Sequence, residues 1–148
     1  MQKTNMIKEL QAILPAGKFI VTGTYALAMY GLYDFDKVKD LDILLWNPKE
    51  EAKSLALNLM ETFPAKLKEN YVGNPLFSSF YYQGTKVDIF IVQNIEPNII
   101  IDDIAYATIS HIVDAKIAIG REKDWVLLQK IAFSIFNKRK YLDYLKRY

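Results

Sequence analysis

Residues 38–46 read Val38-Lys39-Asp40-Leu41-Asp42-Ile43-Leu44-Leu45-Trp46, an apolar run that two aspartates interrupt near its start. The run predicts a β-strand, although Asp is rare in strands because its short polar side chain competes for backbone hydrogen bonds. Alternate strand residues share a face, so we expect Asp40 and Asp42 side by side. Two such carboxylates repel each other unless a cation lies between them, and they suit a hard ion such as Mg²⁺. Charges that discourage edge pairing of a strand are the plainer alternative.

The composition limits the classes of protein to which this chain can belong. It has 148 residues, of which 51% are hydrophobic and 24% charged, as is typical of one globular domain. It has no Cys and a single His, which argues against disulfides and against a zinc site. A net charge of +2 does not by itself indicate nucleic acid, and we expect no stable DNA binding. The apolar runs are too short to span a membrane and the N-terminus is polar, so we expect a cytoplasmic protein.

Apolar periodicity and turn signals predict helices and strands that alternate along the whole chain. We expect helices over residues 4–14, 25–30, 47–63, 111–119, 123–133 and 138–148, with Ser110 as one N-cap. We expect strands over residues 18–22, 38–46, 66–71, 76–82, 86–92 and 99–101. Hairpins between them favour a mixed sheet. We therefore predict a single α+β domain over residues 1–148, with a core at about 18–110 and a helical part at about 111–148.

Two further features accompany the aspartate strand. Gly23 and Thr24 join a strand to a helix, where free backbone N–H groups suit a phosphate, although an ordinary capped helix is the plainer explanation. Asp88 interrupts the apolar strand 86–92, where Lys86 offers a salt bridge. If this strand lies beside the first, the three carboxylates form one cluster that suits Mg²⁺ and a triphosphate. Asp88 could then also accept a proton from an attacking hydroxyl.

These motifs, in this order, resemble the nucleotidyltransferase superfamily that shares the palm core of DNA polymerase β. The matching stretches are Val21-Thr22-Gly23-Thr24, Asp40-Leu41-Asp42 and Val87-Asp88-Ile89. Residues 114–125, with Lys116 and the run Gly120-Arg121-Glu122-Lys123-Asp124, are similar to the small prokaryotic branch of AbiEii-like toxins and lincosamide-type nucleotidyltransferases. Thr24 stands where the family has Ser or Gly, and residues 36–39 depart from the Arg-x-Thr-x that relatives often carry.

The resemblance implies a nucleotidyltransferase-like mixed sheet flanked by helices, and a role for each matching residue. Asp40, Asp42 and Asp88 would bind Mg²⁺ and act as the catalytic acids. Gly23 and Thr24 would meet the phosphates of an NTP, and the remaining triphosphate contacts would come from Lys116, Arg121 and Lys123. From the residues alone, Lys116 could instead lie on a solvated helix face, and residues 121–124 could form a polar turn between helices.

Other conspicuous residues have plainer structural explanations. A lone His at a helix start, as at His111, is more often a surface or capping residue than a catalyst. Trp46 and Trp125 are expected in the core. The basic segment 138–148 has one apolar face, so we expect an amphipathic helix with a solvated basic side, although it could touch RNA or dock on a partner.

The leading hypothesis is a Mg²⁺-dependent enzyme that moves a nucleoside monophosphate from an NTP to a hydroxyl and releases pyrophosphate. The acceptor would be a small molecule, a tRNA or a protein. The alternative is a non-catalytic module that binds a nucleotide or a partner protein, such as one component of a toxin–antitoxin pair. The altered residues 36–39 and the short chain favour the alternative. The position of Asp88 relative to Asp40 and Asp42 discriminates between the two.

Overall fold

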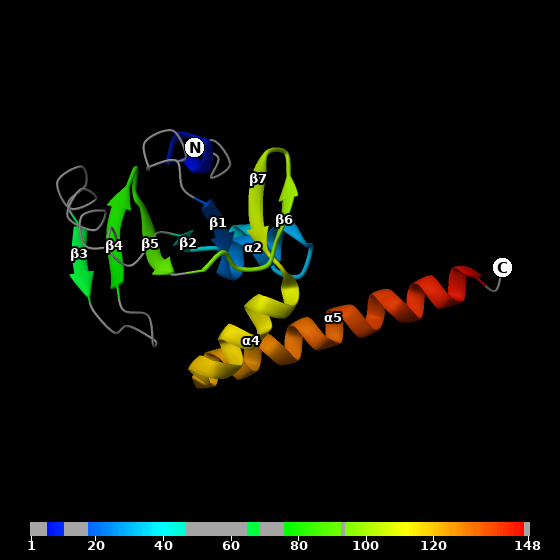
Figure 1. Cartoon of the computed structure of the whole chain (residues 1–148). Helices are drawn as coiled ribbons and strands as arrows, with labels where there is room; N and C mark the ends of the chain where they lie inside the picture. Colours follow the sequence, from blue (N-terminus) through cyan, green and yellow to red (C-terminus); the bar gives the residue numbers. More distant parts are fainter. Residues whose placement is uncertain (1–5, 11–17, 47–64, 69–75, 93, 147–148) are drawn as a thin grey trace.

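The computed structural model describes residues 6–10, 18–46, 65–68, 76–92 and 94–146 of the chain. These residues form one seven-stranded mixed sheet in the order β3-β4-β5-β2-β1-β7-β6, with helices packed on it (Figure 1). The fold is α+β, as predicted. Residues 6–10 are helical. The remaining elements, in chain order, are β1 Lys18–Thr22, α2 Gly23–Met29, a 3-10 turn Phe35–Lys37, β2 Asp40–Trp46, β3 Ala65–Lys68, β4 Leu76–Tyr82, β5 Thr85–Val92, β6 Asn98–Ile101, β7 Ile104–Ala107, α4 Ile109–Ile119 and α5 Glu122–Lys146.

Strand β2 is central, because it pairs antiparallel with β1 on one side and parallel with β5 on the other. Its alternation follows the sequence pattern, since Leu41, Ile43 and Leu45 are at most 1% exposed and face the core. Strand β5 reaches this position through a two-residue hairpin from β4. Gln83 and Gly84 both have positive φ there, which matches the right-handed twist of the flanking strands.

Several predicted elements are confirmed, and some details differ from the prediction. Helix α4 begins at Ile109, and Thr108 rather than Ser110 is its N-cap, since the Thr108 hydroxyl accepts a hydrogen bond from the His111 backbone N–H. Strand β7 was not predicted. It follows a turn in which Asp102 and Asp103 adopt positive φ, a conformation that Asp tolerates better than most residues. The helix predicted over 47–63, and most of the one predicted over 4–14, lie outside the described residues.

Helix α5 is continuous, whereas the sequence predicted a break after Asn137. Asn lowers helix stability by only a fraction of a kcal/mol, about 0.7 at most, so it does not end a helix by itself. The first half of α5 packs beside α4, and Ile131 is 2% exposed. Its second half projects away from the sheet (Figure 1). No helix in the described part of the chain is long and apolar enough to cross a membrane.

Candidate active site

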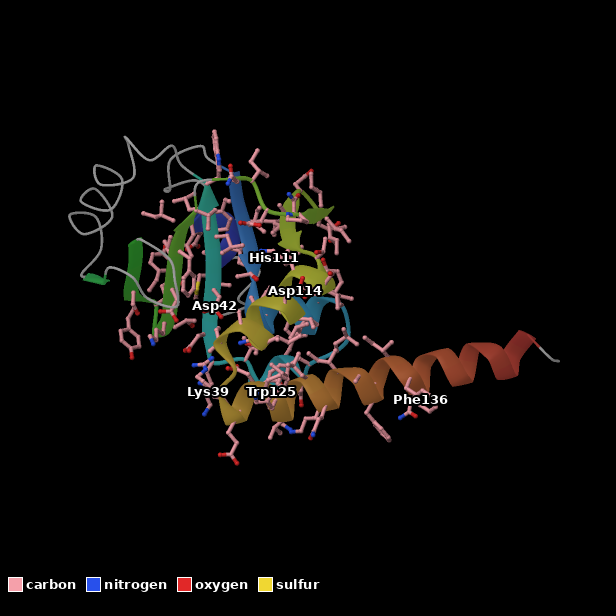
Figure 2. The ribbon with its side chains drawn as sticks, turned by 60° about the horizontal axis from the view of Figure 1, so that its bottom comes forward. Lys39, Asp42, His111, Asp114, Trp125 and Phe136 are labelled. Carbon is pink, nitrogen blue, oxygen red and sulfur yellow. The ribbon has the colours of Figure 1, made fainter. Side chains whose placement is uncertain are left out.

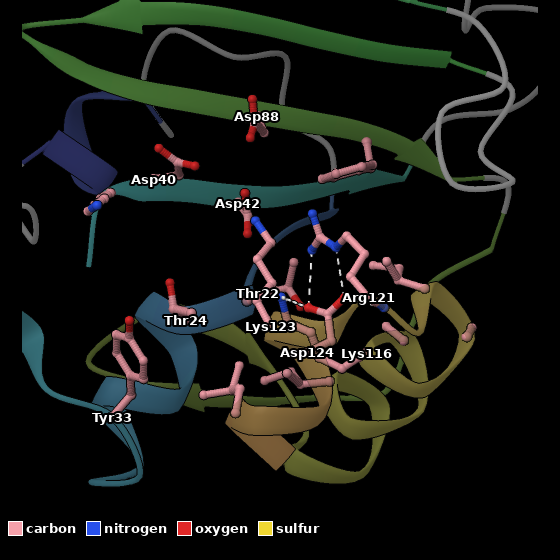
Figure 3. A pocket seen from close by; sticks show the side chains of 18 of the residues that line it. Thr22, Thr24, Tyr33, Asp40, Asp42, Asp88, Lys116, Arg121, Lys123 and Asp124 are labelled. Carbon is pink, nitrogen blue, oxygen red and sulfur yellow. Dashed lines mark hydrogen bonds and ion pairs between the residues drawn. The ribbon is translucent and has the colours of Figure 1, made fainter. Parts of the chain in front are cut away.

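The sheet brings the three predicted carboxylates to one place. The parallel pairing of β2 with β5 sets Asp42 directly opposite Asp88 and sets Asp40 opposite Lys86. Asp88 therefore lies beside the aspartate pair, as the sequence hypothesis required. All three aspartates line a cavity of about 590 Å³ between the sheet and the α4–α5 pair (Figure 3).

Asp42 and Asp88 are largely buried, and few positive charges among the described residues lie close enough to stabilise their ionised forms. Burial and then the negative charge of Asp88 raise the pKa of Asp42 to about 7, against the opposing charge of Lys116. The protonated Asp42 carboxyl donates a hydrogen bond to Asp88. Asp88 is 8% exposed, and its pKa is also raised by burial, although a hydrogen bond to Ser79 and the charge of Lys86 oppose this. The Lys86 Nζ atom is 3.8 Å from Asp88 Oδ2, so the salt bridge considered from the sequence is present but long.

Gly23 allows the start of α2 to approach Asp42 closely. Its φ is +68°, a conformation that L side chains rarely adopt. A Cβ atom there would also clash with Asp42 Oδ2, so the position excludes larger residues on two grounds. Thr22, at the N-cap of α2, makes no side-chain capping hydrogen bond, and Thr24 lines the cavity.

A basic wall, formed by Lys116, Arg121 and Lys123, lies across the cavity from the carboxylates (Figure 3). Asp124 is buried behind this wall, at 2% exposure, and contacts two of its cations. Its Oδ2 accepts a hydrogen bond from Arg121 Nε at 2.7 Å, and its Oδ1 lies 3.7 Å from Lys116 Nζ. Burial alone would raise the pKa of Asp124, but the hydrogen bonds from Arg121 and the charge of Lys116 outweigh it, and the pKa is lowered.

Local sequence explains why Asp124 lies in the first turn of α5. Gly120 ends α4 in a left-handed conformation, with φ of 64°, and α5 begins two residues later. Asp124 is at the third position of α5 and accepts a hydrogen bond from the Arg121 backbone N–H, which is half of a capping box. The resemblance placed residues 120–124 beside the triphosphate and the residues alone suggested a polar turn, but neither predicted that Asp124 is buried. The acid three residues after the N-cap position, Arg121, was a signal for its place in the helix.

All eight predicted site residues line this single cavity: Gly23, Thr24, Asp40, Asp42, Asp88, Lys116, Arg121 and Lys123. Lys116 is only 14% exposed in its side chain, so the solvated-face alternative is wrong for it. His111 also lines the cavity, with Nε2 3.1 Å from Glu96 Oε2, and was not predicted to do so. Trp46 packs against the core as expected, but Trp125 is 49% exposed, which corrects the prediction.

The charge of the cavity suits a polyanion. Among the described residues that line it, seven are Lys or Arg and four are Asp. The additional cations, which are not among the eight predicted site residues, are Lys37, Lys39, Lys86 and Lys130. This excess of positive charge attracts a ligand with several negative charges, such as a triphosphate.

The placement of the carboxylates and the chemistry of their oxygen atoms give different indications for a metal ion. Within the described residues, no group of three His, Cys, Asp or Glu side chains is placed to hold one ion. The chemistry of the donors nevertheless fits a hard cation. Asp88 Oδ1 is buried and finds no hydrogen-bond partner among the described groups, and burial and the charge of Asp88 raise the pKa of Asp42 to about 7. A divalent cation with oxygen ligands would relieve both.

Comparisons with solved structures support the fold. Neither a protein-family model nor a curated protein sequence matches the chain. Solved structures do match: the Megavirus polyadenylate synthase has a TM-score of 0.56 at 15% identity, over 87% of this chain and 30% of its own. The chain thus spans less than a third of that protein. A nucleotidyltransferase candidate from Thermotoga maritima has a TM-score of 0.54 at 16% identity, over 90% of this chain and 96% of its own.

A third structure, an antigenic nucleotidyltransferase-like protein from Paracoccidioides brasiliensis, matches with a TM-score of 0.50 at 13% identity, over 87% of this chain and 71% of its own. The chain has a nucleotidyltransferase-like fold. In this chain, β2, β5 and the α4–α5 pair surround one cavity. The likenesses do not single out the AbiEii-like or lincosamide-type branch.

Proposed function

We propose that this protein transfers a nucleoside monophosphate from an NTP to a hydroxyl acceptor, with Mg²⁺ as cofactor and pyrophosphate as the second product. One observation carries the proposal. Asp42 and Asp88 stand opposite each other in the β2–β5 register, and a basic wall faces them across the same cavity. Carboxylates and cations arranged in this way serve the two charged parts of phosphoryl transfer, the metal ion and the phosphates.

Each group of residues has a separate task in this proposal. Asp40, Asp42 and Asp88 would hold Mg²⁺, which neutralises the charge that develops on the phosphate oxygens when it is bound. Lys116, positioned by Asp124, would bind the triphosphate together with Arg121 and Lys123. Gly23 lets the backbone come close to the phosphates, and Thr24 supplies a hydroxyl beside them.

In this proposal Asp88 would also accept the proton of the attacking hydroxyl. Its pKa is raised, which brings a carboxylate closer to the range in which a general base is effective. Its Oδ1 is free of hydrogen bonds among the described groups, so this atom can take the proton without breaking an existing contact. The acceptor that carries the hydroxyl would be a small molecule, a tRNA or a protein.

A second candidate is a non-catalytic module that binds a nucleotide or a partner protein, such as a toxin–antitoxin component. One observation favours it: the described carboxylates do not converge on one ion. Binding of an NTP without any transfer would distinguish this candidate from the enzyme.

Transfer can be measured with NTPs labelled at the α-phosphate and incubated with Mg²⁺ and an RNA, a protein or a small polyol as acceptor. Asp42→Asn should lower transfer by about 10³-fold or more, because metal stabilisation of the transition state is worth several kcal/mol. Asp114→Asn is the matched control, since Asp114 is exposed on α4 and does not line the cavity. Label transfer that survives Asp42→Asn unchanged would contradict the proposal.

A further inference from the structure

From its middle onward, α5 carries large apolar side chains in contact with solvent. Phe133 is 67% exposed, Phe136 is 63% exposed and Ile135 is 39% exposed. Figure 2 shows Phe136 on the part of the helix that has left the body of the molecule. A helix with apolar residues on several sides is stable in water only when another surface covers it.

A second exposed apolar patch lies at the β6 end of the sheet. Ile95, Ile99 and Ile100 are 50%, 49% and 69% exposed. Strand β6 is the outermost strand of the described sheet on this side, and edge strands that display apolar residues are prone to pair with another chain. Acidic residues surround the patch: Glu96 precedes β6, and Asp102 and Asp103 form the turn that follows it.

The segments of sequence that contain the two apolar patches carry opposite net charges. Residues 121–148, which include α5, contain eight Lys or Arg and three Asp or Glu, a net charge of +5. Because the whole chain has a net charge of +2, residues 1–120 carry −3. The basic run 138–140 immediately follows the exposed phenylalanines, and the acidic turn immediately follows the exposed isoleucines. Each apolar patch therefore has a charged neighbour that complements the other.

Within one molecule, the apolar patch of α5 does not reach the apolar patch at the β6 edge. Both views show the second half of α5 extending outward beyond the β6–β7 side of the sheet (Figures 1 and 2). Both patches remain exposed within the chain. We propose that a second copy of this chain covers them, with α5 of each copy docked on the β6 edge of the other to form a two-fold dimer. A two-fold axis repeats the contact once and closes the assembly, so both patches of both copies are buried.

The dimer interface would also lie close to one end of the cavity. Val126 and Lys130 of α5 line it, and Phe133 lies one helical turn beyond Lys130. The second copy would thus begin next to this end of the cavity. The dimer itself does not depend on the proposed transfer reaction, so either conclusion can fail without the other.

Sedimentation of the full chain over a concentration series tests the dimer. Phe136→Glu should weaken dimerisation by about 30-fold or more, as expected for loss of a central interface residue, and so should Ile100→Glu. Ile117→Glu is the control, because Ile117 is 47% exposed on α4 and belongs to neither patch. Circular dichroism of each variant verifies that it is folded.

Mixing the two variants identifies the pairing. In a mixed dimer, Phe136 of the Ile100→Glu chain meets Ile100 of the Phe136→Glu chain, so one of the two contacts is intact. The mixture should therefore form heterodimers at concentrations at which each variant alone is monomeric. A monomeric wild type, a dimer that resists Phe136→Glu, or a mixture without heterodimers would overturn the proposal. A monomer that instead binds RNA or a different protein through α5 would assign the surface to that partner.

Discussion

Two buried aspartates face the same cavity and have opposite electrostatic surroundings. Asp124 is 2% exposed and has Arg121 and Lys116 as partners, and its pKa is lowered. Asp88 is 8% exposed and has one lysine at 3.8 Å and another carboxyl group, Asp42, opposite it on the next strand. Its pKa is raised. Similar burial therefore leads to an ion pair in one place and to an excess of negative charge in the other.

The difference separates a structural role from a functional one. The charge of Asp124 is neutralised within the fold, where it positions cations. The charges of Asp42 and Asp88 have no adequate partners among the described residues, which lowers the stability of the fold but favours the binding of a cation. Groups with pKa values perturbed by burial and by like charges, and set in a cavity, are typical of functional sites.

The largest effect on stability is expected at Asp124. Asp124→Ala should lower the free energy of unfolding by about 3 kcal/mol, because it removes the carboxylate that offsets the charge of Lys116, whose side chain is only 14% exposed. Asp42→Asn should leave the stability at pH 8 unchanged or increase it, because it removes a carboxylate that is unfavourable there. Urea unfolding of both variants measures the contrast. Equal destabilisation by the two substitutions would contradict the distinction between the two aspartates.

A smaller effect is expected at Gly23. Gly23→Ala should cost about 1–2 kcal/mol from its positive φ, and somewhat more from the clash with Asp42. Gly84→Ala is the matched control, because Gly84 has φ of +83° but no atom within 4 Å of the place where the alanine methyl group would lie. The excess loss of stability in the Gly23 variant measures how closely Asp42 approaches the start of α2. If the two variants lose the same stability, Asp42 does not approach as described.

The change of stability with pH should be gradual, with a slope of no more than about 1.4 kcal/mol per pH unit. The folded protein keeps a proton on Asp42 up to a pKa of about 7, whereas the unfolded chain loses it near pH 4. The Asp42 contribution is therefore fully present below pH 4 and is lost as the pH rises to about 7. Unfolding at a series of pH values should show this fall, and Asp42→Asn should reduce it. A metal-free protein whose stability rises throughout this range, with no change in the variant, would disprove the raised pKa.

The sequence was sufficient to predict the carboxylate side of the site. Strand periodicity of two places Asp40 and Asp42 on one face, and the apolar flanks of Asp88 show that its strand is internal. The sequence could not show that Asp42 and Asp88 would stand opposite each other, because that register depends on the order of the strands in the sheet. The resemblance to nucleotidyltransferases implied that the three acids meet, and the structure places their two strands side by side.

The other side of the site was harder to predict, because it depends on tertiary packing. The burial of Asp124 depends on the packing of α5 beside α4, and no local pattern predicts that packing. The continuity of α5 through Asn137 was missed for a related reason: a weak helix former does not end a helix whose neighbours favour it. Strand β7 is only four residues long and depends on its pairing with β1 and β6.

Calorimetric titration with an NTP, in the presence and absence of Mg²⁺, tests the central claim most directly. The claim is that the β2–β5 carboxylates and the basic wall form one metal–triphosphate site. We predict binding that requires Mg²⁺ in the wild type and is lost in Asp40→Ala/Asp42→Ala. Failure of the wild type to bind any NTP, or binding that the double variant retains, would contradict it.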